Sequence, residues 1–154
     1  MAKRTGAGKT STSAEQGPSF VDTDILVYAF DKSDSTKTET SRRLVTELMD
    51  SDRLRLSTQV LQELFVTLTK KAPGRCSVPE ALAVLEDLAA WPLTVVDYPA
   101  IRAAANLSHR SRISFWDALV IAAAASSGAS TLYTEDLNDG QEILGVRVRN
   151  PFKV

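Results

Sequence analysis

The stretch FVDTDILVY, residues 20–28, decides the expected fold and the position of the candidate site. Its apolar start, Phe20-Val21, predicts a short buried strand that runs into Asp22-Thr23-Asp24. Residues 25–30 continue this segment as either strand or helix, because a short apolar run does not distinguish the two. In open α/β sheets, binding crevices lie outside the carboxyl ends of the strands. Asp22 is therefore the first candidate site residue.

Short apolar segments alternate with amphipathic segments along the rest of the chain. Apolar residues at helical spacing follow capping residues or prolines, as in the segment that Thr58 is expected to cap. Helices are predicted over residues 35–50, 58 to the break at Pro73-Gly74, Pro79 to Trp91, 99–109 and 115–127, and further strands over 54–56, 93–96, 131–134 and 146–148. Such short strands separated by helices predict an α/β fold, a three-layer sandwich with a short, largely parallel central sheet flanked by helices.

The composition excludes several classes of protein. The 154 residues are 44% hydrophobic and 24% charged, which excludes a disordered chain and a disulfide scaffold. A formal charge of −1 excludes nucleic-acid binding through bulk positive charge and leaves only local basic patches. The single Cys76 and the single His109 exclude an internal disulfide and a site of several histidines. The longest apolar run, residues 118–125, is too short to cross a membrane, so we expect a cytoplasmic protein.

Residues 1–19 differ from the rest of the chain, since they are rich in Gly, Ser, Thr and Lys. Beyond Met1 they carry no large apolar side chain, which predicts a flexible tail before one domain of residues 20–154. Gly8-Lys9-Thr10 resembles the end of a phosphate-binding loop, but Lys3 stands where the first glycine belongs and no strand precedes it. We therefore expect no nucleotide site in the tail.

Four separate segments each carry a carboxylate at a strand end or on a helix face. Asp117 lies in an apolar helix without a lysine or arginine near it, so its partner is a cation, a backbone amide or a distant arginine. Glu63 lies beside the apolar stripe of its helix, where a solvated acid is the alternative. The other acids follow predicted strands: Asp22 after the first, and Glu135, Asp136 and Asp139 after 131–134. Carboxylates brought together repel unless a cation holds them ionised, and oxygen ligands suit Mg²⁺ or Mn²⁺.

The basic residues form two local groups. One lies in the turn after the second predicted helix, and the other flanks the helix over 99–109. A solvated surface is the simplest interpretation of each group alone. Beside an acidic metal site they would contact phosphates, and the candidates for this role are Lys70, Lys71, Arg75, Arg110 and Arg112.

Four motifs in this order resemble those of PIN-domain nucleases, and most closely VapC-type toxins of toxin–antitoxin pairs. The motifs are residues 20–28 (FVDTDILVY), 57–64 (STQVLQEL), 114–119 (SFWDAL) and 132–137 (LYTEDL), and the resemblance runs from Phe20 to about Phe152. By position it implies four metal-binding acids, with Asp22 and Asp117 as core ligands completed by Glu63 and Asp136, and a supporting hydroxyl on Thr134. Asp24 stands where the family usually has asparagine, and we expect Asp24 and Asp139 as supporting acids.

The resemblance implies Mg²⁺- or Mn²⁺-dependent endonucleolytic cleavage of RNA, often tRNA or rRNA, by a homodimer that a VapB-like antitoxin holds in check. A metal-held water would attack the phosphorus in line. The apolar faces of the helices over 35–50 and 58–71 are expected to form a groove for the antitoxin. Two alternatives stay open: a haloacid-dehalogenase-like phosphatase with Asp22 as nucleophile, and an inactive PIN-fold binding module.

Overall fold

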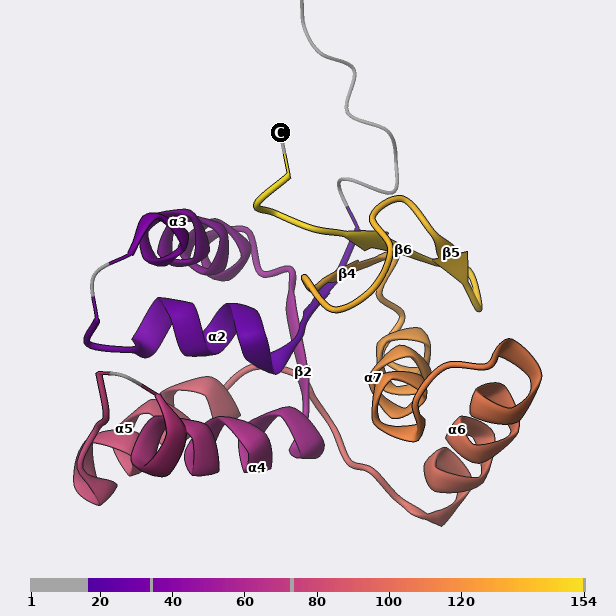
Figure 1. The fold of residues 1–154 in the computed structure, drawn as a ribbon, viewed down its shortest axis with the longest axis horizontal. Coiled ribbons are helices and arrows are strands. Elements are labelled where there is room, and N and C mark those ends of the chain that lie inside the picture. Colours follow the sequence, from indigo (N-terminus) through magenta and orange to yellow (C-terminus); the bar gives the residue numbers. More distant parts are fainter. Residues whose placement is uncertain (1–16, 34, 73, 154) are drawn as a thin grey trace, which may run out of the picture.

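A short strand, β1 (Ser19–Val21), lies in the middle of the sheet around which the chain folds. The computed structural model describes residues 17–33, 35–72 and 74–153. Within them the strand order is β3-β2-β1-β4-β6-β5 (Figure 1), where the further strands are β2 (Leu54–Ser57), β3 (Leu93–Thr94), β4 (Thr131–Tyr133), β5 (Glu142–Ile143) and β6 (Val146–Arg149). Neighbouring strands are parallel except β5 and β6, which are antiparallel. The largely parallel sheet predicted from the sequence is confirmed.

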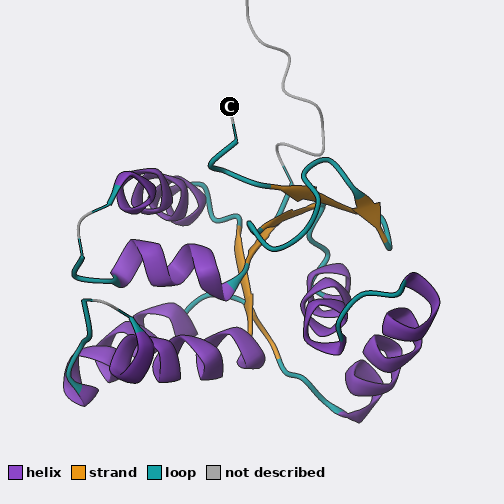
Figure 2. Ribbon diagram, in the orientation of Figure 1, coloured by secondary structure: helices purple, strands orange, loops and turns teal. Residues whose placement is uncertain are grey.

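Helices cover both faces of this sheet (Figures 1 and 2). On one side lie α2 (Thr23–Phe30), α3 (Thr36–Asp50), α4 (Thr58–Val66) and α5 (Val78–Ala89). On the other side lie α6 (Tyr98–Ser111) and α7 (Phe115–Ser126). The last turn of α4 continues as a π-helix, η1 (Thr67–Lys71). The arrangement is the expected three-layer α/β sandwich.

The core forms where these layers meet. Phe20 of β1, Leu56 of β2 and Leu132 of β4 have no exposed surface. Residues 118–124 of α7 are all buried, and they pack with these strand residues in one apolar cluster. Because both faces of the sheet are covered, the central strand β1 is buried along its whole length.

Residues 25–30, which the sequence left as strand or helix, belong to α2. Asp22 decides this outcome because it is the N-cap of the helix, with its Oδ1 accepting a hydrogen bond from the Thr23 N–H at 2.7 Å. The chain therefore turns from strand to helix at Asp22 itself. The same residue is both a candidate ligand and the start of α2.

Two local expectations were wrong, and one strand was missed. The N-cap of α4 is Ser57, whose Oγ accepts from the Val60 N–H at 3.3 Å, while the Thr58 Oγ1 accepts from the Val96 N–H at 3.0 Å. That bond holds the residues after β3, so β3 ends at Thr94 instead of continuing to residue 96. The short strand β5 was not predicted, because two residues carry too weak a pattern; it pairs with β6 across a turn with positive φ at Leu144 and Gly145.

The first strand begins one residue before the predicted start at Phe20. Ser19 is the first residue of β1, and its N–H donates to the Arg53 carbonyl at 2.8 Å. The phosphate-loop-like Gly8-Lys9-Thr10 lies outside the described residues. Among the described residues, none of the helices has both the length and the apolar character needed to span a membrane.

We predict that Phe20→Ala lowers the free energy of unfolding by about 3–5 kcal/mol, because it leaves a cavity in the central strand. Val78→Ala is the control, since Val78 is 51% exposed and its loss should change stability by less than about 0.5 kcal/mol. Urea unfolding of both variants measures the difference. Similar stabilities for the two variants would contradict a core centred on β1.

Candidate metal centre

Asp22 is held at the carboxyl end of β1 by hydrogen bonds to both of its carboxylate oxygens. The Oδ1 accepts from the Thr23 N–H at 2.7 Å, and the Oδ2 accepts from the Thr134 Oγ1 at 2.9 Å. Thr134 follows β4 and is fully buried, and the Asp22 residue is only 6% exposed. The Thr134 hydroxyl thus links the ends of two neighbouring parallel strands.

Asp24 joins the same group from the first turn of α2. Its Oδ1 accepts from the Ile25 N–H at 2.8 Å, and its Oδ2 accepts from the Glu135 N–H at 2.9 Å. Carboxylate oxygens of Asp22, Asp24 and Asp136 all lie within 4.8 Å of one another. Asp24, expected only as a supporting acid, is therefore a member of the tightest acidic cluster among the described residues.

Asp136 reaches this cluster through its own backbone. Its N–H donates to the Thr134 Oγ1 at 3.1 Å, so the threonine hydroxyl accepts one bond and donates another toward Asp22. Asp136 is exposed where Asp22 is buried. The cluster consequently has a buried side and a side open to solvent, which is the arrangement of a site that a solute can enter.

Glu63 of α4 is fixed next to the cluster. Its Oε2 accepts from the Thr23 Oγ1 at 2.9 Å, and its Oε1 accepts from the Gln59 Nε2 at 3.0 Å. These bonds set it apart from the freely solvated acid that the sequence left as an alternative. The negative charge of Glu63 raises the pKa of both Asp22 and Asp136, after larger effects of burial.

Asp117 lies on the first turn of α7, half-buried. Its backbone N–H is bound by the N-cap Ser114 Oγ at 3.0 Å, while its carboxylate makes no hydrogen bond or ion pair with the described residues. It lies near enough to Asp136 that its charge is the largest cause, after burial, of the raised pKa of Asp136. The backbone-amide and arginine partners considered from the sequence are not seen there.

Burial and mutual repulsion work against the ionisation of this cluster. Burial, partly offset by the bonds from Thr23 and Thr134, raises the pKa of Asp22 to about 6. Burial and the charge of Asp22 raise the pKa of Asp24 to about 8. The protein alone therefore does not neutralise these acids, and a cation bound between them would.

The donor set suits a hard divalent cation. The cluster presents carboxylate oxygens only, and the described residues bring no histidine or cysteine into it. Oxygen donors with an open side for water are the surroundings that Mg²⁺ and Mn²⁺ take in proteins.

The remaining predicted residues lie around or away from the cluster. Lys71 lines a hollow of about 410 Å³ together with Thr23, Glu63 and Thr67. The other basic candidates are exposed, with Lys70 on η1, Arg75 after it, and Arg110 and Arg112 at the end of α6 on the opposite side of the sheet (Figure 1). Asp139 is not in the cluster: its Oδ1 accepts from the Asn150 N–H at 2.8 Å, beyond the end of β6.

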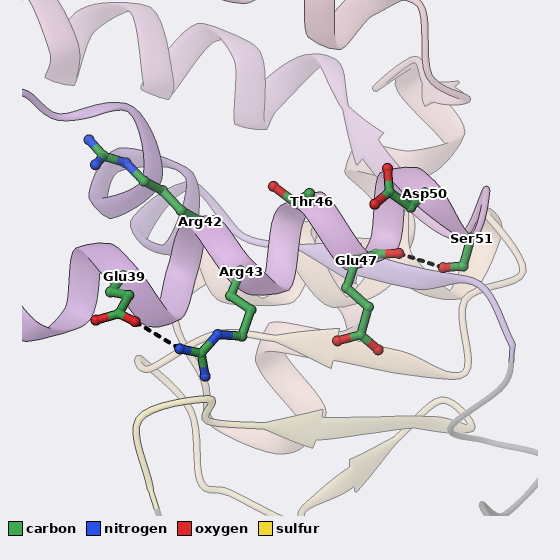
Figure 3. Close-up of a pocket in the computed structure, with 7 residues that line it drawn as sticks. All are labelled: Glu39, Arg42, Arg43, Thr46, Glu47, Asp50 and Ser51. Atoms are coloured by element: carbon green, nitrogen blue, oxygen red, sulfur yellow. Dashed lines mark hydrogen bonds and ion pairs between the residues drawn. The ribbon is translucent and has the colours of Figure 1, made fainter.

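A second hollow, of about 480 Å³, adjoins the first. It is lined in part by Asp24 and Tyr28, and it shares Thr23 and Thr67 with the hollow beside Lys71. A third hollow, of about 720 Å³, lies along the outer side of α3 and contains none of the candidate residues (Figure 3). The space available next to the acids therefore lies between α2 and the end of α4.

Sequence reasoning missed the residues that hold the acids in place. Tyr28 and Lys37 carried no recognisable signal, because each acts on a carboxylate brought from another element. Gln59 could have been found, since it lies one helical turn before Glu63 on α4. The Lys37 Nζ lies 2.6 Å from the Glu135 Oε2 across 98 positions of sequence. Only the fold makes such pairs visible.

Comparison with known proteins gives the family. The PIN domain model matches residues 19–138, which is more than three quarters of the chain. No curated protein sequence matches significantly. This match favours the nuclease-like family over the phosphatase that the sequence left open.

The fold is also similar to that of solved structures that include a toxin and a toxin–antitoxin complex. VapC20 of Mycobacterium tuberculosis, described as a toxin that cleaves the sarcin–ricin loop, is 20% identical, with a TM-score of 0.59 over 74% of this chain and 86% of that one. A toxin–antitoxin complex from Klebsiella pneumoniae is 16% identical, with a TM-score of 0.66 over 88% and 99%. DNA-bound VapBC from Salmonella typhimurium is 19% identical, with a TM-score of 0.61 over 88% and 98%. On the family match and this shared fold, the chain belongs to the PIN domain family.

Proposed function

We propose that this protein is a metal-dependent endoribonuclease, the toxin of a toxin–antitoxin pair, which hydrolyses RNA phosphodiester bonds in the cytoplasm. The observation that carries the proposal is the cluster of Asp22, Asp24 and Asp136, whose oxygens lie within 4.8 Å at the carboxyl ends of β1 and β4. Burial and repulsion raise the pKa of all three acids, so a bound cation would stabilise their ionised forms. The mechanism, the metal and the RNA target are parts of this proposal.

Four of the acids have distinct places in the proposed mechanism, and Asp24 is a supporting acid. Asp22 and Asp117 are the core ligands for Mg²⁺ or Mn²⁺, and Glu63 and Asp136 complete the site as ligands or by orienting water. Asp22 and Glu63 are rigid, because hydrogen bonds hold both oxygens of each. Asp136 is exposed and Asp117 half-buried, so both carboxylates would be accessible to orient water or take up its proton. A divalent cation in this site lowers the pKa of water and stabilises charge on the phosphate oxygens.

RNA binding requires local positive charge, because the whole chain has a formal charge of −1. Lys71 is the best-placed contact for a phosphate, since it lines the same hollow as Glu63. Lys70, Arg75, Arg110 and Arg112 are exposed and would extend the contact along the backbone of tRNA or rRNA.

A VapB-like antitoxin is the proposed partner. The groove expected between the apolar faces of α3 and α4 is not available, because Thr38, Val45 and Leu48 of α3 are buried in the fold. We propose instead that the antitoxin binds in the two hollows that share Thr23 and Thr67, which are lined in part by Glu63 and Asp24. An arginine or lysine of the antitoxin placed there would pair with the carboxylates and exclude the metal. We also propose a homodimer, for which exposed Val95, Tyr98 and Ile101 offer an apolar surface.

We predict that Asp117→Asn lowers RNA cleavage in Mn²⁺ by about 100-fold or more, because a ligand is lost and partners of ligands alone contribute 10–100-fold. Stability without metal should be unchanged or higher, since one negative charge near Asp136 disappears. Gel assays of RNA cleavage and thermal unfolding in EDTA measure the two effects. Asp50→Asn, an exposed acid on the outer side of α3 (Figure 3), is the control and should keep full activity. Cleavage at the wild-type rate by Asp117→Asn would refute its role as a ligand.

We also predict that the metal-free protein becomes less stable as the pH rises from 5 to 8. The pKa values of Asp22 and Asp24 are raised in the folded state to about 6 and about 8, so the folded state binds more protons than the unfolded state in this range. Urea unfolding in EDTA should show a loss of a few kcal/mol, at about 1.4 kcal/mol per pKa unit. Saturating Mn²⁺ should abolish most of this loss. A flat profile in EDTA would contradict the electrostatic description of the cluster.

For the partner, we predict that expression of this protein alone arrests growth. Co-expression of the small protein encoded by the adjacent gene should relieve the arrest. The purified antitoxin should block RNA cleavage in vitro. Excess Mg²⁺ should partly reverse this block, because the metal competes with the arginine or lysine of the antitoxin for the same carboxylates. Growth without arrest by a chain that cleaves RNA in vitro would overturn the toxin assignment and leave the nuclease assignment standing.

A further inference from the structure

Both carboxylate oxygens of Glu135 are held by residues that the proposed mechanism does not use. The Tyr28 hydroxyl donates to the Oε1 at 2.6 Å, and the Lys37 Nζ lies 2.6 Å from the Oε2. Tyr28 belongs to α2, Lys37 to the first turn of α3, and Glu135 follows β4. Three separate elements therefore meet at one carboxylate, which lies next to Asp136 in the sequence.

Two aromatic rings brace the lysine of this group. The Lys37 Nζ lies 5.2 Å from the ring centroid of Tyr28 and 5.0 Å from that of Phe152. The two rings pack edge to face, with centroids 5.4 Å apart. Cation–π contacts add to the ion pair and restrict the lysine to one position, although 42% of its side chain is exposed. We call Tyr28, Lys37, Glu135 and Phe152 the Glu135 clamp.

The backbone of Glu135 connects the clamp to the acidic cluster. Its N–H donates to the Asp24 Oδ2 at 2.9 Å. On either side of it, the Thr134 hydroxyl donates to Asp22 and the Asp136 N–H donates to that hydroxyl. A change in the position of the Glu135 side chain would therefore shift the donors that orient Asp22 and Asp24.

We propose that Lys37 is a positioning residue, which through the Glu135 clamp fixes residues 134–136 against Asp22 and Asp24 and so sets the geometry in which the cluster binds its cation. The inference rests on the metal binding proposed above. It adds a residue of α3 to a site built otherwise from α2, α4, α7 and the end of β4. Lys37 itself contacts neither the metal nor the RNA.

Charge alone and positioning predict opposite effects for the loss of Lys37. Removing a positive charge near the acids makes the site more negative, which by charge alone would strengthen the binding of a divalent cation. Releasing the Glu135 side chain lets the metal-binding carboxylates move, which weakens the binding of a divalent cation. The direction of the change in Mn²⁺ affinity therefore decides between the two.

The test measures Mn²⁺ binding to the full chain by the electron paramagnetic resonance signal of free Mn²⁺. Lys37→Met should weaken binding about tenfold, the lower end of what partners of metal ligands contribute. Lys37→Arg should restore most of the affinity, because it keeps the ion pair. Tyr28→Phe, a second variant without a charge change, should weaken binding in the same direction by less.

Arg43→Met is the matched control. Arg43 lies on α3 six residues beyond Lys37, about 9 Å of helical rise away, and its pair with Glu39 at 2.8 Å faces the outer hollow (Figure 3). The substitution removes the same charge from the same helix without touching Glu135. Its Mn²⁺ affinity should equal that of the wild type or exceed it slightly.

Amide hydrogen exchange of the metal-free protein gives a second, independent measurement. The Glu135 N–H should exchange faster in Lys37→Met than in the wild type or in Arg43→Met, because its bond to Asp24 loosens. Unchanged exchange there, or Mn²⁺ binding by Lys37→Met as tight as that of the wild type, would overturn the inference. If the wild type binds no Mn²⁺, the proposed function fails, and the exchange rate of Glu135 still decides whether the clamp fixes this segment.

Discussion

The parallel pairing of β1 with β4 is the constraint on which the site depends. Phe20 lies opposite Leu132 and Val21 opposite Tyr133, and the Asp22 N–H continues the ladder to the Tyr133 carbonyl at 3.0 Å. Because parallel strands end at the same edge of a sheet, the next residues meet there. The hydrogen bond from Thr134 to Asp22 is the direct result. A register shift of one residue would turn these side chains to the opposite faces and separate them.

This pairing brings together like charges that the protein only partly compensates. Backbone N–H groups and the Thr134 hydroxyl orient the carboxylates, yet burial still raises the pKa of Asp22 and Asp24 well above 3.8. An isolated buried carboxylate is unfavourable, and several together are more so. The carboxylates are therefore oriented to bind a cation, and without one their negative charges are only partly compensated. Stability and the proposed activity are linked through the same few side chains.

Of two lysines near the acids, one would supply the positive charge that RNA binding requires in a nearly neutral protein. Positive charge is local: Lys71 lines the hollow beside Glu63, and Lys37 is engaged by Glu135. A cation next to the acids has different roles depending on whether a carboxylate already holds it. Lys71 makes no hydrogen bond or ion pair with the described residues and suits a phosphate, while Lys37, which is paired with Glu135, suits the positioning of a loop. The apolar face of α3 has a structural role as well, since it is buried in the core.

The sequence predicted most of the helices and strands, the α/β class and the four segments that carry acids, because local periodicity and capping depend on near neighbours. It predicted α7 around Asp117, since an apolar helix with a serine N-cap is recognisable from its own residues. The tertiary structure was needed to see that Asp24 joins the tightest cluster, that Thr23 binds Glu63, and that Lys37 reaches Glu135. The two hydrogen bonds among them join residues 40 and 98 positions apart. Their distances follow from strand register and helix packing, which no local pattern of residues encodes.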